Sequence, residues 1–262
     1  MSLLDPKERT DRGVKTQTEL LGVPAPEPAT LLQASWRDYV FAEVWTRPGL
    51  DRRSRYWIAI AGAAGAGREP QLLEGYIRGA LKQGEVTLGE LREAVLHFAV
   101  YEGWPKAGFF DECVTRIAEE LGLPPAPIAP IRGEPWDPEV RLDEGGANYQ
   151  YIMTTPPPPK ATAYYVTGIR GFVFGEMWMR PGLDKRARRW ITLVGVADSS
   201  SVLPIQSHLW GALAAGDCTP EELEEFVLQY AVQAGWPMAA FLQQKVLEFG
   251  ERWREMQAGG ES

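Results

Sequence analysis

The residues best suited to proton transfer are the two histidines of the chain, His97 and His208. Imidazole gains and loses protons near neutral pH, which suits general acid and base catalysis. The histidines occupy non-equivalent positions in two copies of a repeated pattern, since Tyr76 aligns with His208 and Gln229 with His97. We expect His208 to act as the catalytic acid or base. The alternative for both histidines is a buried ring with a structural hydrogen bond.

Two glutamates and two arginines recur at equivalent positions. Glu43 and Glu176 each lie among large apolar residues, where a carboxylate either exchanges protons with a raised pKa or pairs with a neighbouring arginine. We favour pairing. Arg47 and Arg180 could contact anionic groups of a substrate, yet their Pro-Gly-Leu-Asp context favours bracing of a helix entrance.

The repetition is most exact at Arg-Pro-Gly-Leu-Asp, which occurs at 47–51 and 180–184, and at Gly-Trp-Pro, which occurs at 103–105 and 235–237. The two offsets are 133 and 132 residues, so the chain is a tandem duplication. We expect repeat one at 5–126, a proline-rich linker at 127–137 and repeat two at 138–256. Each repeat has the length of an ordinary domain with its own core.

The elements that carry these residues are predicted to be helices. Asp51 and Asp184 suit N-caps, and Thr87 and Thr219 each precede a glutamate by three residues, which is a capping box. No segment alternates with the period of two that indicates a strand. The fold class is therefore all-α, with helices expected at 53–66, 72–83 and 106–121 and, in the second copy, at 186–197, 205–215 and 238–254, and one more helix following each threonine.

Composition limits the function classes. The net charge of −8 argues against a general affinity for nucleic acid or an anionic membrane. The longest apolar run, 58–66, is too short to span a bilayer, so we expect a cytoplasmic protein. Cys113 and Cys218 occupy unrelated positions and indicate neither a disulfide framework nor a metal site.

The order of motifs resembles the carboxymuconolactone decarboxylase family. It runs Phe-x-Glu-x-Trp-x-Arg-Pro-Gly-Leu-Asp, a Gly-Ala-Leu helix, Thr-x-x-Glu-Leu and Gly-Trp-Pro, twice over nearly the whole chain. The resemblance implies two fused, alkylhydroperoxidase D-like helical domains without a cofactor. Members of the family assemble into rings, so it also implies a homotrimer with six domains.

The thiol peroxidases of this broad family use Cys-x-x-Cys with a histidine four residues later. The cysteine positions hold Ser201 and Pro204 before His208, and Glu69 and Leu72 before Tyr76. A peroxidase needs a thiolate nucleophile, so this activity is not expected.

The decarboxylases of the family carry His-x-Arg-Gly-Ala-Leu, and the two copies divide this string. Repeat one has Tyr76 and Arg78, whereas repeat two has His208 and Trp210. By the resemblance, Arg78 holds a carboxylate or lactone oxygen, or else it forms a salt bridge. Tyr76 either donates a hydrogen bond where a histidine would act or fills space, and Trp210 makes the second site more apolar.

The predicted function is a cofactor-independent decarboxylase or isomerase that acts on a small lactone or enolisable acid, with a site around His208 and Glu176. The alternative is a non-catalytic ligand-binding or assembly module, and metal-dependent hydrolysis is a weaker third. The geometry separates the first two: the enzyme requires His208 and Glu176 to line one open cavity with a cation nearby.

Overall fold

A computed structural model describes residues 5–68 and 70–259, and no strand occurs in these ranges. The predicted all-α class is therefore confirmed. Repeat one contains α1 (Pro6–Leu21), α2 (Leu31–Ser35), the π-helical η1 (Trp36–Val44), α3 (Arg52–Ala66), α4 (Pro70–Lys82), α5 (Leu88–Glu102) and α6 (Trp104–Glu120). Repeat two contains α7 (Pro138–Met153), the π-helical η2 (Tyr164–Met177), α8 (Lys185–Asp198), α9 (Val202–Ala214), α10 (Pro220–Ala234) and α11 (Trp236–Gly259).

The helix starts follow the capping residues that the sequence indicates. Asp51 accepts a hydrogen bond from the Ser54 amide and Asp184 one from the Ala187 amide, both at 2.8 Å. The capping boxes that open α5 and α10 are both complete. Such caps satisfy backbone donors at the first turn, which explains why the two copies begin their helices at equivalent residues.

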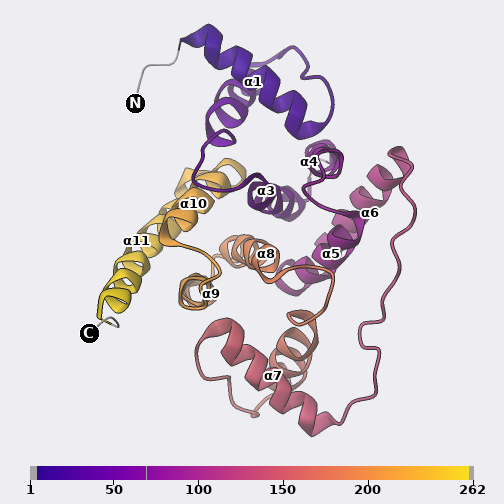
Figure 1. Cartoon of the computed structure of the whole chain (residues 1–262), viewed down its shortest axis with the longest axis vertical. Coiled ribbons are helices and arrows are strands. Elements are labelled where there is room, and N and C mark those ends of the chain that lie inside the picture. Colours follow the sequence, from indigo (N-terminus) through magenta and orange to yellow (C-terminus); the bar gives the residue numbers. More distant parts are fainter. Residues whose placement is uncertain (1–4, 69, 260–262) are drawn as a thin grey trace.

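The two repeats are interleaved around α3 and α8, which pack against each other at the centre (Figure 1). Helix α10 of repeat two packs on α3 of repeat one, and α5 of repeat one packs on α8 of repeat two. Most buried side chains of both repeats, including Trp57 and Trp190, form one continuous cluster, and a small second cluster of Ile152, Met153, Phe174 and Trp178 lies at the α7 and η2 end. Separate cores for the two repeats were expected, and the structure has a shared one because each repeat contributes a helix to the other half.

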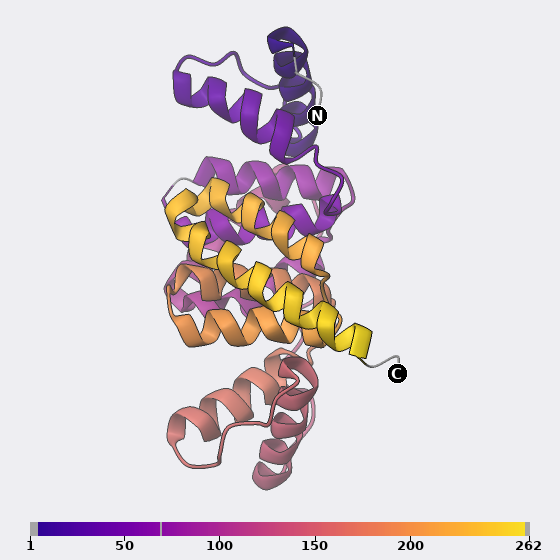
Figure 2. The ribbon, with the colours of Figure 1, turned by 90° about the vertical axis from the view of Figure 1, so that its left-hand side faces the viewer.

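A helical hairpin lies at each end of the molecule (Figure 2). Helix α1 packs on η1, and α7 packs on η2. The contact is close because α1 and α7 present glycines: a Cβ on Gly13 would lie 2.3 Å from the Arg37 carbonyl oxygen, and one on Gly145 would lie 1.9 Å from that of Arg170. These glycines let the backbones of α1 and η1, and of α7 and η2, approach each other closely.

The segment between α6 and α7 crosses the outside of the second half. The carbonyl oxygens of Pro130 and Ile131 each accept a hydrogen bond from Arg180 Nη1 at 2.8 Å.

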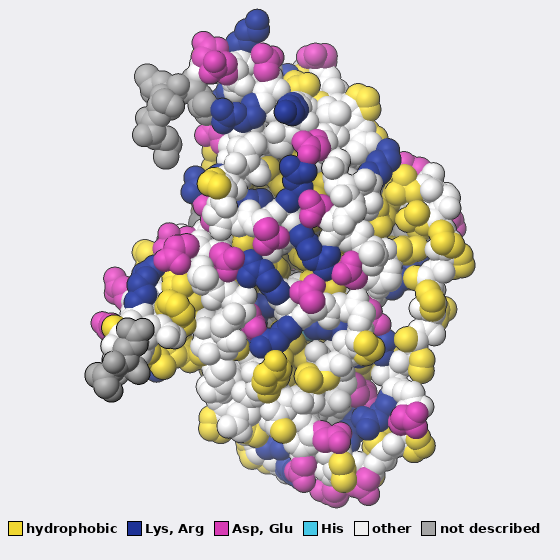
Figure 3. Space-filling model, in the orientation of Figure 1, with side chains coloured by type: hydrophobic (Ala, Val, Ile, Leu, Met, Phe, Trp, Pro, Cys, Tyr) yellow, Lys and Arg dark blue, Asp and Glu magenta, His cyan; other side chains and the backbone are white. Residues whose placement is uncertain are grey.

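Lys and Arg side chains alternate with Asp and Glu over the face in Figure 3. No helix within the described ranges is long and apolar enough to cross a bilayer.

Candidate functional site

The structure brings both histidines into one half of the molecule, although they belong to different repeats. His97 lies on α5 and His208 on α9, and the ring of Tyr101 lies between them. The ring centroids are 5.4 Å apart for His97 and Tyr101 and 5.5 Å apart for Tyr101 and His208. Helix α5 of repeat one packs against helices of repeat two, and this packing brings the two histidines close to each other. An alignment of the repeats does not reveal it.

A cavity of about 670 Å³ opens beside His208 and Tyr101. Its wall comes from α5, the first residue of α6, α7, η2, the end of α8 and α9. None of its lining residues is Asp, Glu, Lys or Arg. The side chains of Trp104, Tyr164 and Leu203 also line it, and they are 60%, 69% and 77% exposed, so the cavity is open to solvent. An open, mainly apolar cavity with a few polar groups is the usual form of a small-molecule site.

Burial favours the neutral form of the His208 imidazole. The residue is 8% exposed, and its Nδ1 is buried without a hydrogen-bond partner in the structure. Burial, with a smaller contribution from the charge of Arg189, lowers the pKa of His208 to about 3. The expected pKa near neutrality is therefore not found for His208 in this structure. A bound carboxylate would favour the charged ring and raise this pKa.

Tyr101 has the best-defined hydroxyl in the cavity wall. Its oxygen accepts a hydrogen bond of 2.7 Å from Trp178 Nε1, and the direction is certain because an indole nitrogen only donates. Burial raises the pKa of Tyr101 to about 12, although the interactions with Thr192 and Trp178 oppose the rise. Tyr101 is one of the residues that line the cavity, so its phenol is a candidate hydrogen-bond donor to a ligand.

His97 lies behind Tyr101 and does not line the cavity. Its Nε2 is 2.9 Å from Thr192 Oγ1, and its Nδ1 is 3.4 Å from Arg188 Nη1. The ring is fully buried, and burial together with the charge of Arg188 holds its pKa well below the ordinary value. His97 is thus a neutral ring that supports the Thr192 and Tyr101 side of the wall.

The equivalent place in the other half holds no histidine. Tyr76 stands in place of His208, Gln233 in place of Tyr101 and Gln229 in place of His97. Tyr76 is fully buried and stacks on Trp45 at 5.6 Å. Its hydroxyl is buried and has no hydrogen-bond partner in the structure, and burial raises its pKa to about 12. This half therefore contains a buried phenol and two amides where the other half contains two imidazoles and a phenol.

The predicted carboxylates do not line the cavity of His208. Glu43 pairs with Arg9 at 2.6 Å, and Glu176 pairs with Arg141 at 3.0 Å. The Glu176 side chain is 7% exposed, whereas Glu43 is partly open to solvent. Both glutamates thus form the arginine pairs that the sequence analysis favoured, and the structure does not bring Glu176 together with His208.

The predicted substrate-binding residues also lie outside this cavity. Each arginine pairs with a glutamate, and Trp210 lies under another cation. The shortest distances are 2.7 Å for Arg47 with Glu225, 2.7 Å for Arg78 with Glu120 and 2.6 Å for Arg180 with Glu93, and the Arg252 guanidinium is 4.3 Å from the Trp210 ring centroid. The expected cation is absent from the lining residues. Arg189 is fully buried, lies 5.0 Å from the Trp178 ring and pairs with Asp217.

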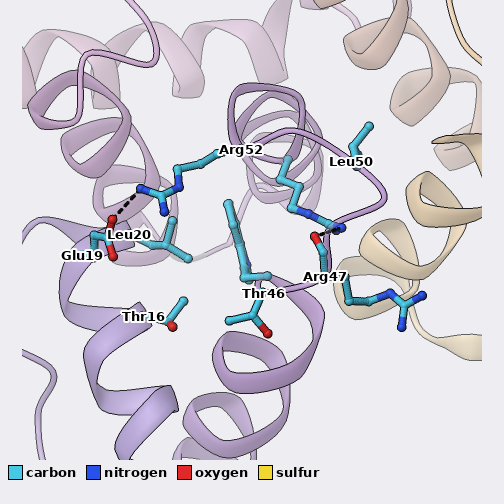
Figure 4. Close-up of a pocket in the computed structure, with 9 residues that line it drawn as sticks. Thr16, Glu19, Leu20, Thr46, Arg47, Leu50 and Arg52 are labelled. Atoms are coloured by element: carbon cyan, nitrogen blue, oxygen red, sulfur yellow. Dashed lines mark hydrogen bonds and ion pairs between the residues drawn. The ribbon is translucent and has the colours of Figure 1, made fainter. Parts of the chain in front are cut away.

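A second cavity, of about 360 Å³, lies between α1, the end of η1 and the start of α3 (Figure 4). Its cations are already paired: Arg52 contacts Glu19 at 2.5 Å, and Arg55 donates to the carbonyl oxygen of Arg47 at 3.0 Å (Figure 4). No histidine, tyrosine or cysteine lines it. Proton-transfer groups therefore gather at the cavity of His208 and not at this one.

Sequence reasoning missed Tyr101, Trp178 and Thr192. A signal for Tyr101 was present, because it follows His97 by four residues and so lies on the same face of its helix. Thr192 lies on α8 and Trp178 directly after η2, both in repeat two, and the packing of α5 against α8 and η2 brings them to Tyr101.

Comparison with known proteins agrees with this two-copy architecture. The family model described as the carboxymuconolactone decarboxylase family matches residues 30–110 and 164–243. The chain is 28% identical over 133 residues to 4-carboxymuconolactone decarboxylase of Acinetobacter baylyi, covering 48% of this chain and 98% of that protein. It is 36% identical over 107 residues to nitrosuccinic acid decarboxylase of Metarhizium robertsii, covering 36% of this chain and 71% of that protein. The chain therefore belongs to the carboxymuconolactone decarboxylase family and carries two copies of its domain.

Proposed function

We propose that this protein is a cofactor-independent decarboxylase whose active site is the cavity of His208 and Tyr101. Both relatives are named as decarboxylases. The observation that carries the proposal is the placement of an imidazole and a phenol side by side on the wall of an otherwise uncharged cavity. The substrate would be a carboxylic acid with a neighbouring carbonyl, lactone or nitro group that can accept the electron pair left by carbon dioxide.

Binding would begin with the loss of water from the carboxylate. The cavity wall offers it no cation, so the concentrated charge of the carboxylate is less stable there than the spread charge of the transition state. The carboxylate beside His208 raises the pKa of that ring, and the substrate therefore binds together with a proton. His208 then carries the acid that the reaction needs.

The chemical step would break the bond between the substrate carbon and its carboxylate carbon. Carbon dioxide leaves, and the electron pair moves into the neighbouring acceptor group, whose oxygen becomes negative. The Tyr101 hydroxyl donates a hydrogen bond to that oxygen, and the donation is strengthened by the bond from Trp178 Nε1 to the phenol oxygen. His208 finally gives its proton to the carbon and returns to the neutral form.

The test is carbon dioxide release from carboxylic acids that carry an adjacent lactone, ketone or nitro group. His208→Gln removes the acid and should lower turnover by about 10² to 10⁴-fold. Tyr101→Phe removes one donor to the developing negative oxygen and should lower kcat by about 10² to 10³-fold. Tyr76→Phe is the matched control at the position equivalent to His208, and its turnover should stay within a few-fold of the original.

Two results would contradict the enzyme and favour a ligand-binding module. One is the absence of carbon dioxide release from acids that bind the cavity. The other is unchanged turnover after the double substitution of His208 and His97 by alanine. The enzyme hypothesis predicts Glu176 and a cation beside His208, and neither lines the cavity. These two observations give the ligand-binding alternative its weight.

We further propose that the chain forms a homotrimer with six domains in the cytoplasm. Exposed apolar side chains such as Leu31 and Leu32, 91% and 70% exposed, offer surface for contacts between copies. Light scattering should then report three times the chain mass of 29.2 kDa. A mass of one chain at micromolar concentration would refute the trimer.

A further inference from the structure

We infer that the cavity of His208 selects aromatic or otherwise apolar acids with a single carboxylate, and that it rejects acids with two. The inference rests on the proposed function, because it takes this cavity as the substrate site. Its basis is the wall itself, in which no lining residue is Asp, Glu, Lys or Arg.

A second carboxylate would have no compensating charge in this cavity. Burial of an unpaired carboxylate is costly, because neither water nor a cation replaces its hydration. Arg189 is the cation behind Trp178, but two of its nitrogens already contact Asp217 Oδ2, at 3.0 Å and 2.7 Å, and one also donates to the Ile152 carbonyl oxygen. Its Nη1 has no hydrogen-bond partner in the structure, but the guanidinium is fully buried and Arg189 is not among the residues that line the cavity.

The polar groups that do line the cavity can serve one carboxylate and one acceptor oxygen. They are neutral: the His208 ring, the Tyr101 hydroxyl and the hydroxyls of residues such as Ser207. Ser207 lies next to His208 on α9 and donates to the Pro204 carbonyl oxygen at 3.2 Å. The charge of the single carboxylate is thus matched only by protonation of His208, which has one positive charge to offer.

The remaining wall suits a planar apolar body. Trp104 and Phe172 line the cavity with ring centroids 6.0 Å apart, and Tyr149 meets Phe174 edge to face at 4.7 Å. Ring faces and edges of this kind pack well against aromatic ligands. A volume of about 670 Å³ lies within the range of cavities that hold drug-sized molecules.

The other cavity described above is lined by arginines, so the lack of a cation is specific to the cavity of His208. The cavity of Figure 4 is lined by Arg47, Arg52 and Arg55. Nitrosuccinic acid, the compound in the name of one relative, has two carboxyl groups. We therefore expect the preferred acid of this chain to differ from that compound in charge and in size.

The test compares two rigid probes that differ by one carboxylate, 2-naphthoate and naphthalene-2,6-dicarboxylate. Their affinities for the whole chain are measured by isothermal titration calorimetry at pH 7. We expect 2-naphthoate to bind at least about tenfold more tightly, since one tenfold step corresponds to only 1.4 kcal/mol and an unpaired buried charge costs more. Equal affinity, tighter binding of the dicarboxylate, or binding of succinate in place of both probes would overturn the inference.

A gained cation should reverse the preference. Ser207→Arg places a guanidinium in the cavity beside His208 and should raise the affinity for the dicarboxylate at least tenfold. Gln206→Arg is the matched control, because Gln206 is the preceding residue on α9 and does not line the cavity. If Ser207→Arg does not fold, Leu203→Arg provides the same charge from a lining position that is 77% exposed. An arginine that folds at either position and leaves the preference unchanged would count against the inference.

These measurements do not depend on turnover, because naphthoates serve only as binding probes. The expected preference without carbon dioxide release from any acid would keep the selectivity and remove the decarboxylase. Release of carbon dioxide with a preference for dicarboxylates would keep the decarboxylase and remove the selectivity.

Discussion

Replacement of Glu93 by glutamine tests the link between the shared core and the active site. Glu93 lies on α5 of repeat one and binds two cations of repeat two. Its carboxylate holds Arg180 through Nε at 2.9 Å and Nη2 at 2.6 Å, and Arg188 Nη2 lies 3.7 Å away. Arg188 is 1% exposed and touches His97, so one carboxylate supports both the joint between repeats and the wall behind Tyr101.

The loss of stability follows from the buried charge that the substitution leaves unpaired. Burial already lowers the pKa of Arg188 to about 10, which shows how poorly water reaches this guanidinium. Removal of one partner of a buried ion pair costs about 3 to 5 kcal/mol, and the amide oxygen keeps one acceptor, so we expect about 3 kcal/mol. For a chain of this size that loss corresponds to a fall in Tm of roughly 6 to 12 °C. Calorimetry and urea unfolding measure it directly.

The duplication supplies the control. Glu225 is the equivalent of Glu93, and it holds Arg47 at 2.7 Å and the buried Arg55 at 2.8 Å, the latter closer than Arg188 is to Glu93. Glu225→Gln should cost at least as much stability. Arg55 contacts Gln229 and not a histidine, so this variant should keep its turnover, whereas Glu93→Gln should lose about tenfold or more through displacement of the wall.

Turnover is compared well below both values of Tm. A cost under about 1 kcal/mol in both variants would show that these carboxylates do not hold the repeats together. An equal loss of turnover in both variants would refute the assignment of the active site to one half.

Three further predictions concern stability and thiol reactivity. Burial raises the pKa of Glu102 to about 7, so the folded state binds this proton more tightly than the unfolded state. The free energy of unfolding should therefore fall as pH rises from about 4.5 to about 7. Urea unfolding of Glu102→Gln should show a weaker dependence of this free energy on pH. Gly145→Ala should lower the free energy of unfolding by at least about 2 kcal/mol, because its Cβ would meet a backbone carbonyl, whereas Gly108→Ala has open space and should not, as calorimetry can check. Burial raises the pKa of Cys113 to about 11 and that of Cys218 to about 12, so Ellman's reagent should react with these thiols only after unfolding.

Much of the fold can be predicted because its signals are local. Aspartate and threonine caps act within three residues, and the predicted starts at Asp51 and Thr87 match those of α3 and α5. The start of α7 was also readable, since Asp137 precedes a proline at the first helical position and caps two amides. The segment 127–137 is interpreted as a linker because it is rich in proline, and the helix that starts at its end is therefore not predicted. The π-helical η1 and η2 have no comparable local signature.

The site is harder to predict because it depends on which helices meet. Comparison of the copies shows that His97 and His208 are not equivalent, and this suggests one histidine in each half. The packing of α5 on α8 reverses that conclusion and puts both rings in one half. The charged residues of the shared motifs, such as Arg180 and Glu176, are equally misleading, because their strict repetition reflects ion pairs that both halves need.

The packing of α5 against the other repeat also explains why the protein needs the repeat whose own equivalent site is closed. The cavity of His208 requires Tyr101 from α5, and α5 is held by α6 of its own repeat and by α8 of the other. Repeat one therefore cannot be removed without loss of a cavity wall, even though its own equivalent position is closed by Tyr76. Matching caps and carboxylate–arginine clusters are needed on both sides, whereas proton-transfer groups are needed on one. The replacements of His208 by Tyr76, Tyr101 by Gln233 and His97 by Gln229 between the copies accordingly lie around one cavity and its equivalent, whereas the caps and the carboxylate–arginine clusters recur in both copies.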